Sequence, residues 1–354
     1  MKFLAVLCVK NEAAFLLEWL AHHQAVGFTD FLVFSNDCSD GTDTMLDRLA
    51  ESGILTHVRN DGPYDKGGIQ FTALKQAEKL DIVRDADWIL PFDVDEFVNI
   101  HVGDHRLPDL IAALPEATAI TLTWRLFGNG DVVRYVDRPV TQTFTKAAPE
   151  VLFWPWRASM FKTLYRNDGT YRKLGVHRPR SPDPDRIGAA RWFDASGRTL
   201  DPKFHTGRIF SNYGRKNNRL AQLNHYPLGA MESYVVKADR GRAVHSDHML
   251  DVDYWVERNF CTHEDQTIRT LGPQMNANLA AFMSDETLNQ LHQSAVAWRH
   301  ARFDALMKQE PFRALFGRLL MTPPTRPVTL KAAQMLVRHA NLARSGDNGS
   351  GGAA

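Results

Sequence analysis

The sequence WILPFDVDEF at residues 88–97 combines an apolar run with two aspartates that lie two positions apart. A short apolar run that ends in acidic residues is typical of a buried strand that delivers carboxylates to the edge of a sheet. On an extended backbone, Asp93 and Asp95 would point to the same face and Val94 into the protein. Two carboxylates on one face repel each other unless a cation lies between them, and oxygen ligands suit Mg²⁺ or Mn²⁺. The stretch therefore predicts a divalent metal site, against the alternative of a solvated loop after an ordinary strand.

Length and composition narrow the class of protein. The chain has 354 residues, which suits two domains or one large domain with an appendage. Its net charge of +1 provides no field suited to nucleic acid or to an anionic membrane. Three scattered cysteines argue against a disulfide framework and a zinc–thiolate site, and they predict reduced thiols in a cytoplasmic protein. No apolar run reaches the roughly 18 residues of a membrane span, so we expect a soluble chain.

Strand-like and helix-like patterns alternate over residues 1–100. Strands are expected at residues 3–9, 31–35, 54–58 and 88–92, and helices in the segment ending at Gly27, at 42–51 and at 67–80. This alternation predicts an α/β fold with a mainly parallel sheet and helices on both faces. Ligands of such sheets bind beyond the carboxyl ends of the strands. Polar residues at 11–12, 36–40 and 93–96 follow strand ends, so we expect them to line one crevice.

The pattern changes after residue 100. Apolar and polar residues alternate over 120–126, which predicts a half-buried strand. Residues 172–219 contain 12 Lys or Arg against 4 Asp. This excess of positive charge predicts either a solvated surface or a face that binds a phosphate group or an acidic acceptor. Helices are expected near 252–270, 285–308, 312–320 and 328–343. We therefore expect one domain at 1–240, with a nucleotide-binding half at 1–100 and an acceptor half at 101–240, then a helical region at 241–343 and a disordered tail at 344–354.

Several motifs, taken in order, resemble the family 2 glycosyltransferases, and most closely a bacterial branch that is similar to family 92. The motifs are Val9-Lys10-Asn11-Glu12, Glu18-Trp19 with His23 and Gly27, residues 36–42, DVDEF at 93–97, residues 124–128, Lys162 and Asn224-His225-Tyr226. Their order over residues 3–242 is more specific than any one of them. The resemblance implies a GT-A fold, a nucleotide-sugar donor with a UDP-sugar favoured, Mn²⁺ or Mg²⁺, and transfer with inversion to a hydroxyl of a glycan or lipid-linked glycan.

The resemblance also implies roles for individual residues. Asp93 and Asp95 would hold the metal against the donor diphosphate, and His225 would complete the metal shell. Residues that would bind the donor are Asn11, Glu12, Asn36, Asp37, Asp40 and Asp93. The acidic base of family 2 has no clear counterpart after the DxD motif. Candidates for the base are Asp131, Glu150 and Glu232, and His177 could take that role instead.

Three other classes share parts of these patterns. A phosphatase of the haloacid dehalogenase type also places DxD after an apolar strand, but Phe97 stands where its small hydroxyl residue is expected. A nucleotidyltransferase would carry a Gly-rich phosphate loop after the first strand, and residues 8–12 contain no glycine. A non-catalytic sugar-binding scaffold remains open, as does the oligomeric state. The C-terminal helices could pair subunits, lie on a membrane surface, or pack onto the catalytic domain.

Overall fold

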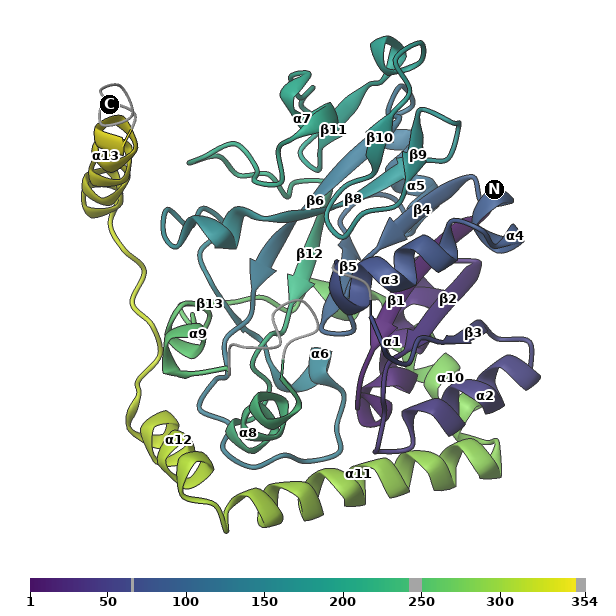
Figure 1. Cartoon of the computed structure of the whole chain (residues 1–354), viewed down its shortest axis with the longest axis vertical. Helices are drawn as coiled ribbons and strands as arrows, with labels where there is room; N and C mark the ends of the chain where they lie inside the picture. The colour runs from purple at the N-terminus through teal and green to yellow at the C-terminus, as the bar shows by residue number, and fades with distance from the viewer. Residues whose placement is uncertain (65–66, 242–249, 348–354) are drawn as a thin grey trace.

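A computed structural model describes residues 1–64, 67–241 and 250–347 of the chain (Figure 1). Its centre is a 9-stranded sheet with the path β3-β2-β1-β4-β8-β6-β12-β5, and β11 pairs with β6 off this path. Neighbouring strands are parallel among β1 (Phe3–Val9), β2 (Asp30–Ser35), β3 (Thr56–Arg59) and β4 (Trp88–Pro91). The strands predicted at the N-terminus are confirmed, within two residues at their ends.

The second half of the sheet mixes directions. β8 (Phe161–Arg166) is antiparallel to both β4 and β6 (Ala119–Leu126). β12 (Ala221–His225) is parallel to β6 and antiparallel to β5 (Glu96–Ile100), and β11 (Trp192–Asp194) is parallel to β6. Small two-stranded ladders join β7 (Lys146–Ala147) to β13 (His263–Glu264) and β9 (Tyr171–Lys173) to β10 (Arg180–Pro182). Parallel pairs outnumber antiparallel pairs in the main sheet, as the sequence predicts.

Helices cover both faces of the parallel strands, because both faces of β1 are apolar. Phe3 and Leu7 belong to a core shared with α1 (Ala13–Val26) and α2 (Thr42–Glu51). Leu4 and Val6, which point the other way, pack in a second core with α3 (Gly68–Ala77) and α4 (Asp81–Arg84). Gly27 ends α1 at a φ of 107°, a conformation that favours glycine. The shorter helices are α5 (Leu107–Ala113), α6 (Val140–Thr143), α7 (Lys203–Thr206) and the 3₁₀ turns η1 (Trp156–Ser159) and η2 (Ile187–Ala189).

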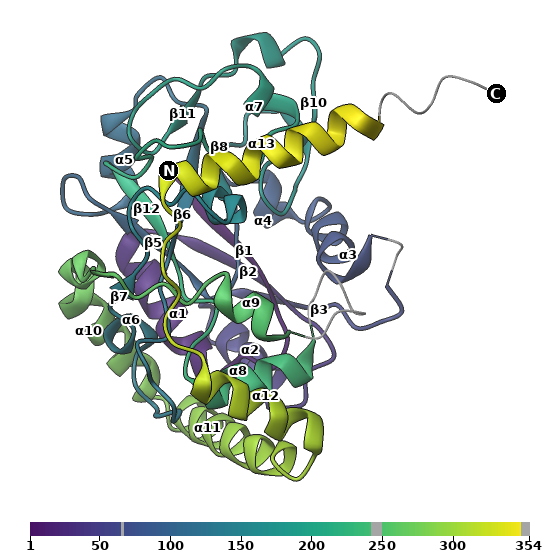
Figure 2. The same ribbon diagram turned by 90° about the vertical axis from the view of Figure 1, so that its left-hand side faces the viewer.

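The C-terminal helices share the core of the sheet domain. α10 (Gly272–Met283) packs against α1, and α11 (Glu286–Leu306) packs against α1, α2 and α8 (Met231–Arg240). α12 (Glu310–Met321) packs against α8, whereas α13 (Leu330–Asp347) lies away from the sheet (Figures 1 and 2). Within the described ranges, no helix has both the length and the apolarity needed to cross a bilayer.

Two predictions in this region are corrected. A continuous helix at 252–270 is wrong: the segment forms α9 (Val252–Val256), β13 and the 3₁₀ helix η3 (Thr267–Leu271), and the unpredicted α10 follows. The tail expected to be disordered from residue 344 is helical as far as Asp347, and residues 348–354 lie outside the described ranges.

Candidate active site

The DxD segment forms a turn between two buried strands. The Glu96 N–H donates to the Asp93 carbonyl oxygen at 3.0 Å, and β5 begins at Glu96. The extended backbone expected at residues 93–95 is therefore wrong. β5 pairs with β12 so that Glu96 lies opposite His225, which brings the end of β12 to the DxD turn from 129 positions further along the chain. This pairing places the first half of the chain against the second at the carboxyl end of β4.

Asp95 is held by a lysine from α8. Lys237 Nζ donates to Asp95 Oδ2 at 2.7 Å and to the Pro227 carbonyl oxygen at 2.7 Å. His225 Nε2 lies 3.7 Å from Asp95 Oδ1. Burial alone would raise the pKa of Asp95, but the neighbouring Lys237 and His225 hold the pKa of this carboxyl well below its usual value. Asp95 is therefore ionised at neutral pH.

Asp93 has different partners on the other side of the turn. Its Oδ2 accepts from Lys162 Nζ at 2.9 Å, and its Oδ1 accepts from Gln70 Nε2 at 3.1 Å. Lys162 comes from β8 and is 1% exposed, so its charge depends on Asp93 and on Glu96, whose Oε2 lies 3.7 Å away. Glu96 accepts from Trp124 Nε1 at 2.6 Å. Burial raises the pKa of Glu96 to about 8, so this carboxyl is a poorer anion than Asp95, whose pKa is lowered.

A cleft of about 990 Å³ opens at this edge of the sheet. Its walls come from the ends of β1, β2, β4, β6 and β12, from α8 and α9, and from the loops at 176–177 and 209–210. The volume lies at the upper end of the range of about 300–1,000 Å³ for small-molecule and cofactor sites. Lys10 and Arg157 line it, and neither side chain has an ion pair or hydrogen bond among the described residues. The cleft is therefore suited to a large ligand with negative charge.

The structure brings six of the predicted site residues to this cleft. They are Glu12, Asn36, Asp93, Asp95, His177 and His225. Glu12 forms an ion pair with Arg240 of α8, and its N–H donates to Thr42 Oγ1 at 3.0 Å. Asn36 Nδ2 donates to the Val9 carbonyl oxygen at 2.8 Å, which fixes this side chain between β1 and β2. Glu12, Asn36 and Asp93 follow the ends of the parallel strands β1, β2 and β4, as the sequence predicts.

Three of the expected donor-binding residues do not line the described part of the cleft. Asp40 is 5% exposed, and its Oδ2 accepts from the first N–H of α1, at Ala13, at 3.1 Å. Its Oδ1 accepts from the Thr42 N–H at 3.0 Å, so this carboxylate joins α1 to α2. Asp37 is exposed and accepts from Tyr64 Oη, and Asn11 accepts from the Ser39 N–H at 2.7 Å. The side chains that the sequence assigns to donor binding are therefore engaged in hydrogen bonds within turns and at helix ends.

The acidic candidates for the base also lie elsewhere. Asp131 is exposed in a turn at a φ of 61°, after the chain has left β6, and it lines no described part of the cleft. Glu150 pairs with Lys216 at 2.6 Å, and Glu232 accepts from the Tyr135 N–H at 2.9 Å. His177 alone among the base candidates reaches the described cleft, whose wall also includes the carboxylate of Asp253.

Sequence reasoning missed the cations of α8. Lys237 and Arg240 lie three apart, so they share one face of the helix, and both form ion pairs with site carboxylates. The sequence signal that could have identified them is a pair of cations three positions apart on one face of a helix. The basic segment 172–219 contributes no Lys or Arg to the described cleft walls. Arg198 pairs with Asp194 and Lys216 with Glu150, so local ion pairs take up part of its charge.

The donor set is compatible with a divalent cation held by two protein ligands. Among the described residues, no three His, Cys, Asp or Glu side chains are grouped to hold a metal ion. Asp95 Oδ1 and His225 Nε2 are too far apart, at 3.7 Å, for a hydrogen bond. Two adjacent ligands of an octahedral ion are about 3 Å apart, so a small movement brings both atoms onto one ion. Burial lowers the pKa of His225, which keeps its imidazole in the neutral form that binds metals.

Comparison with known proteins identifies relatives of this chain. The model of glycosyltransferase family 92 matches residues 5–190. A family 92 protein of Oryza sativa subsp. japonica is 25% identical over 150 residues, which cover 40% of this chain and 24% of that protein. A family 92 protein of Arabidopsis thaliana is 26% identical over 123 residues, which cover 34% and 20%. The chain thus spans about a quarter or less of the length of these relatives.

Comparison with solved structures found partial similarities. Staphylococcus aureus TarS in complex with UDP gives a TM-score of 0.33 at 16% identity, over 80% of this chain and 74% of that chain. Glucosyl-3-phosphoglycerate synthase from Mycobacterium tuberculosis gives a TM-score of 0.24 at 18% identity, over 35% and 44%. The mainly parallel sheet flanked by helices is a GT-A architecture, and the family model covers more than half of the residues. This chain belongs to glycosyltransferase family 92.

Proposed function

We propose that the cleft at the end of β4 transfers a sugar from a nucleotide-diphosphate sugar to an acceptor hydroxyl on a glycan or lipid-linked glycan. The observation that carries this proposal is the pair Asp95 and His225, which face each other beside two unpaired cations in a cleft of about 990 Å³. Membership of family 92 supports it, and the complexes of TarS with UDP and with UDP-GlcNAc favour a UDP-sugar as the donor.

The donor diphosphate would lie between the wall that carries Lys10 and the wall that carries Arg157. Lys10 follows β1 and Arg157 belongs to η1. Both are available to an anionic ligand, since charge-assisted hydrogen bonds to phosphate are among the stronger polar contacts. A Mn²⁺ or Mg²⁺ ion held by Asp95 and His225 would offset the charge that develops on the leaving diphosphate. Asp93, fixed by Lys162 and Gln70, would orient the part of the donor next to that ion.

His177 is the proposed base of an inverting transfer. Its Nδ1 lies 3.0 Å from the Phe161 carbonyl oxygen, which can only accept, so Nδ1 carries the proton and Nε2 has the free lone pair. Burial, reinforced by the charge of Lys162, lowers the pKa of His177 to about 4. The imidazole is then neutral at pH 7 with Nε2 free to accept a proton, and its lowered pKa makes it a weaker base than an ordinary histidine. Asp253, exposed on the cleft wall, is the competing candidate for this role.

The proposal is tested by calorimetric titration of nucleotide diphosphates, with and without Mn²⁺, into the wild type and Asp95→Asn. We expect UDP to bind most tightly, Mn²⁺ to strengthen that binding, and Asp95→Asn to abolish the effect of the metal. Asp131→Asn is the matched control, because it removes a similar carboxylate outside the described cleft and should change nothing. Absence of nucleotide binding in the wild type under every metal condition would contradict the proposed function.

A further inference from the structure

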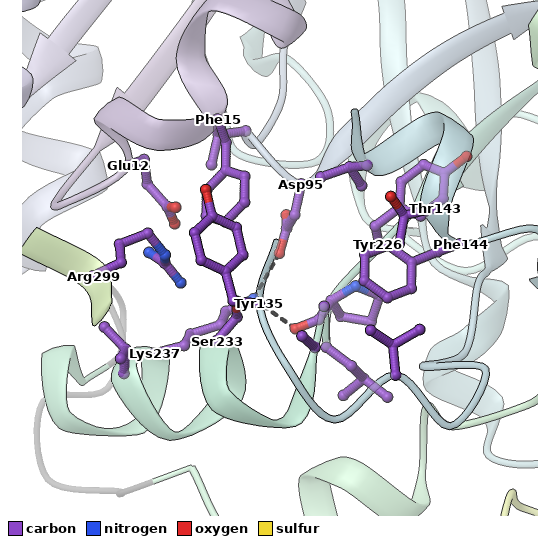
Figure 3. A pocket seen from close by; sticks show the side chains of 18 of the residues that line it. Glu12, Phe15, Asp95, Tyr135, Thr143, Phe144, Tyr226, Ser233, Lys237 and Arg299 are labelled. Carbon is purple, nitrogen blue, oxygen red and sulfur yellow. Dashed lines mark hydrogen bonds and ion pairs between the residues drawn. The ribbon is translucent and has the colours of Figure 1, made fainter. Parts of the chain in front are cut away.

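A second cavity, here called the inner pocket, lies behind the DxD turn (Figure 3). Its volume is about 290 Å³, enough for a monosaccharide unit, and it shares five lining residues with the cleft. The shared residues are Glu12, Val94, Asp95, Lys237 and Arg240. The ion pair between Asp95 and Lys237 therefore forms part of the wall between the two cavities (Figure 3). The residues of the inner pocket that come from α8 and α11 lie outside residues 5–190, which the family model matches.

The walls of the inner pocket are largely aromatic and aliphatic. Phe15 comes from α1, Tyr135 and Phe144 from the segment between β6 and β7, and Trp298 from α11. Phe15 and Tyr135 meet edge to face, with ring centroids 5.8 Å apart. Aromatic faces of this kind pack against the apolar faces of sugar rings, whose hydroxyl edges need polar partners. Ser233 offers one, because its Oγ is buried with no hydrogen-bond partner among the described residues.

Arg299 of α11 is a buried cation without an anion. Its side chain is 5% exposed, and its guanidinium carbon lies 4.5 Å from the Phe15 ring centroid and 5.4 Å from that of Tyr135. Its Nε is buried without a hydrogen-bond partner, and the described residues provide no ion pair to this guanidinium. A buried charge with no partner is unfavourable by several kcal/mol. The two rings accept no classical hydrogen bond from the guanidinium, so its N–H groups remain available to an acceptor.

The acids that line the inner pocket are already paired. They and their partners are Glu12 with Arg240, Asp95 with Lys237, and Asp239 with Arg302. Glu12 favours the charged form of Arg299 at a distance, yet its carboxylate bonds to Arg240 instead. At the rim, Arg134 and Arg138 are exposed and have no ion pair within the described ranges. The lining therefore carries an excess of positive charge that only a ligand can balance.

We propose that the inner pocket binds an anionic sugar unit of the acceptor, with its acid group on Arg299 and its ring against the aromatic walls. This inference rests on the proposed function, since it places the acceptor one ion pair away from the donor cleft. A carboxylate of a uronic acid and a phosphate ester of a sugar can each present two oxygens to the N–H fork of a guanidinium. The pocket thus selects an acceptor that carries an acid group. The probes below distinguish a carboxylate from a phosphate ester as that group.

The test uses methyl β-glucuronide, glucose 6-phosphate and methyl β-glucoside as probes, with binding measured by NMR or calorimetry in the absence of donor. We expect the wild type to bind at least one acidic probe about 10- to 100-fold more tightly than the neutral glucoside, the range for a hydrogen bond to a charged group. Preference for glucuronide identifies a carboxylate acceptor, and preference for the phosphate identifies a phosphorylated one. Equal binding of acidic and neutral probes, or no binding of any, overturns the inference.

Three variants locate the binding. Arg299→Gln should remove the acid preference, and Arg299→Lys should weaken it because an ammonium cannot bind two oxygens in one plane. Arg318→Gln, which removes an exposed arginine of α12, should leave it unchanged. Val136→Trp fills the mouth of the pocket from a side chain that is 57% exposed, so it should block the probes even where Arg299→Gln fails to fold. Retention of acid preference in Arg299→Gln or Val136→Trp contradicts the inference.

A titration of UDP and Mn²⁺ into the same variants separates this inference from the proposed function. UDP should bind to Val136→Trp as it does to the wild type, because Val136 lines the inner pocket and not the described cleft. UDP binding without any acid preference would refute the acceptor subsite alone. Loss of UDP binding in the wild type would refute the proposed function itself.

Discussion

Lys237 of α8 donates to Asp95 of the DxD turn at 2.7 Å, across 142 positions of sequence. This contact joins the helix that follows β12 to the turn that follows β4, and it lies between the donor cleft and the inner pocket. The Lys237 side chain is half-buried, and Asp95 raises its pKa in spite of the desolvation. The position of Asp95, and therefore of any ion that it binds, depends on a residue that no local motif contains.

Lys237→Met should destabilise the protein by roughly 1–3 kcal/mol at pH 7, because the partly buried Asp95 carboxylate loses its partner. The wild-type pKa of Asp95 is depressed, so its stabilising contribution is present above the ordinary carboxyl pKa and disappears as the pH falls through the folded value. The difference between wild type and variant should therefore shrink in acid. Urea unfolding at several pH values measures this difference in the free energy of unfolding.

The double variant Lys237→Met with Asp95→Asn isolates the pair. With both charges gone, we expect most of the lost stability to return, because no uncompensated charge remains buried. Equal losses in the single and the double variant would show that Lys237 acts by packing alone.

His225→Gln should weaken the Mn²⁺-dependent part of UDP binding by about 10-fold or more and leave metal-free binding nearly unchanged. The physical reason is that a glutamine side chain is longer and more flexible than an imidazole, so it holds its oxygen less firmly at the ion. Calorimetry with and without Mn²⁺ measures the metal-dependent and the metal-free affinity for UDP. A uniform loss with and without metal would instead assign His225 to the shape of the cleft, since its ring also lies 4.4 Å from that of Trp124.

His177→Ala should lower kcat by about 10²- to 10⁴-fold, the range for loss of a general base, and leave UDP affinity intact. In the wild type, kcat should rise with pH only up to about pH 5 and then remain flat, because the pKa of His177 is lowered to about 4 by burial and by Lys162. Asp253→Asn is the paired comparison. The larger fall in kcat identifies the base, and a small effect of His177→Ala would contradict its assignment.

His22→Gln should reduce the loss of stability in acid. His22 is 2% exposed and lies 2.8 Å from the Val98 carbonyl oxygen, and burial lowers its pKa to about 4. The unfolded chain takes up this proton near pH 6.5 and the folded protein near pH 4, so His22 destabilises the fold as the pH falls through that window, by roughly 3 kcal/mol in total. Unfolding between pH 7 and 4 should show a shallower slope for the variant. His263→Gln, at an exposed histidine, is the control and should keep the wild-type slope.

The alternation of strands and helices over residues 1–100 was predictable because it is local. Each strand there is a short apolar run, and each helix ends at a glycine or a polar turn, so the chain itself specifies the elements and their order. The first strand at Phe3–Val9 and the helix at Thr42–Glu51 have the predicted limits. Prediction failed where elements depend on distant partners. β13 exists only because it pairs with β7, where His263 lies opposite Ala147, 116 positions earlier, and so the predicted helix at 252–270 does not form.

The sequence by itself determined the parallel half of the sheet, the DxD position, and the candidate residues at the ends of its strands. Only the tertiary structure decided which of those side chains are free to meet a ligand. Asp40 and Asp131 carry the same group as Asp95, but Asp40 caps α1 and Asp131 lies in an exposed turn. The sequence states the chemical type of each side chain. Its burial and its ion-pair or hydrogen-bond partners depend on segments that folding brings together, such as α8 and α11. For that reason Lys237 beside Asp95, and the unpaired Arg299 in the inner pocket, could not be read from any motif.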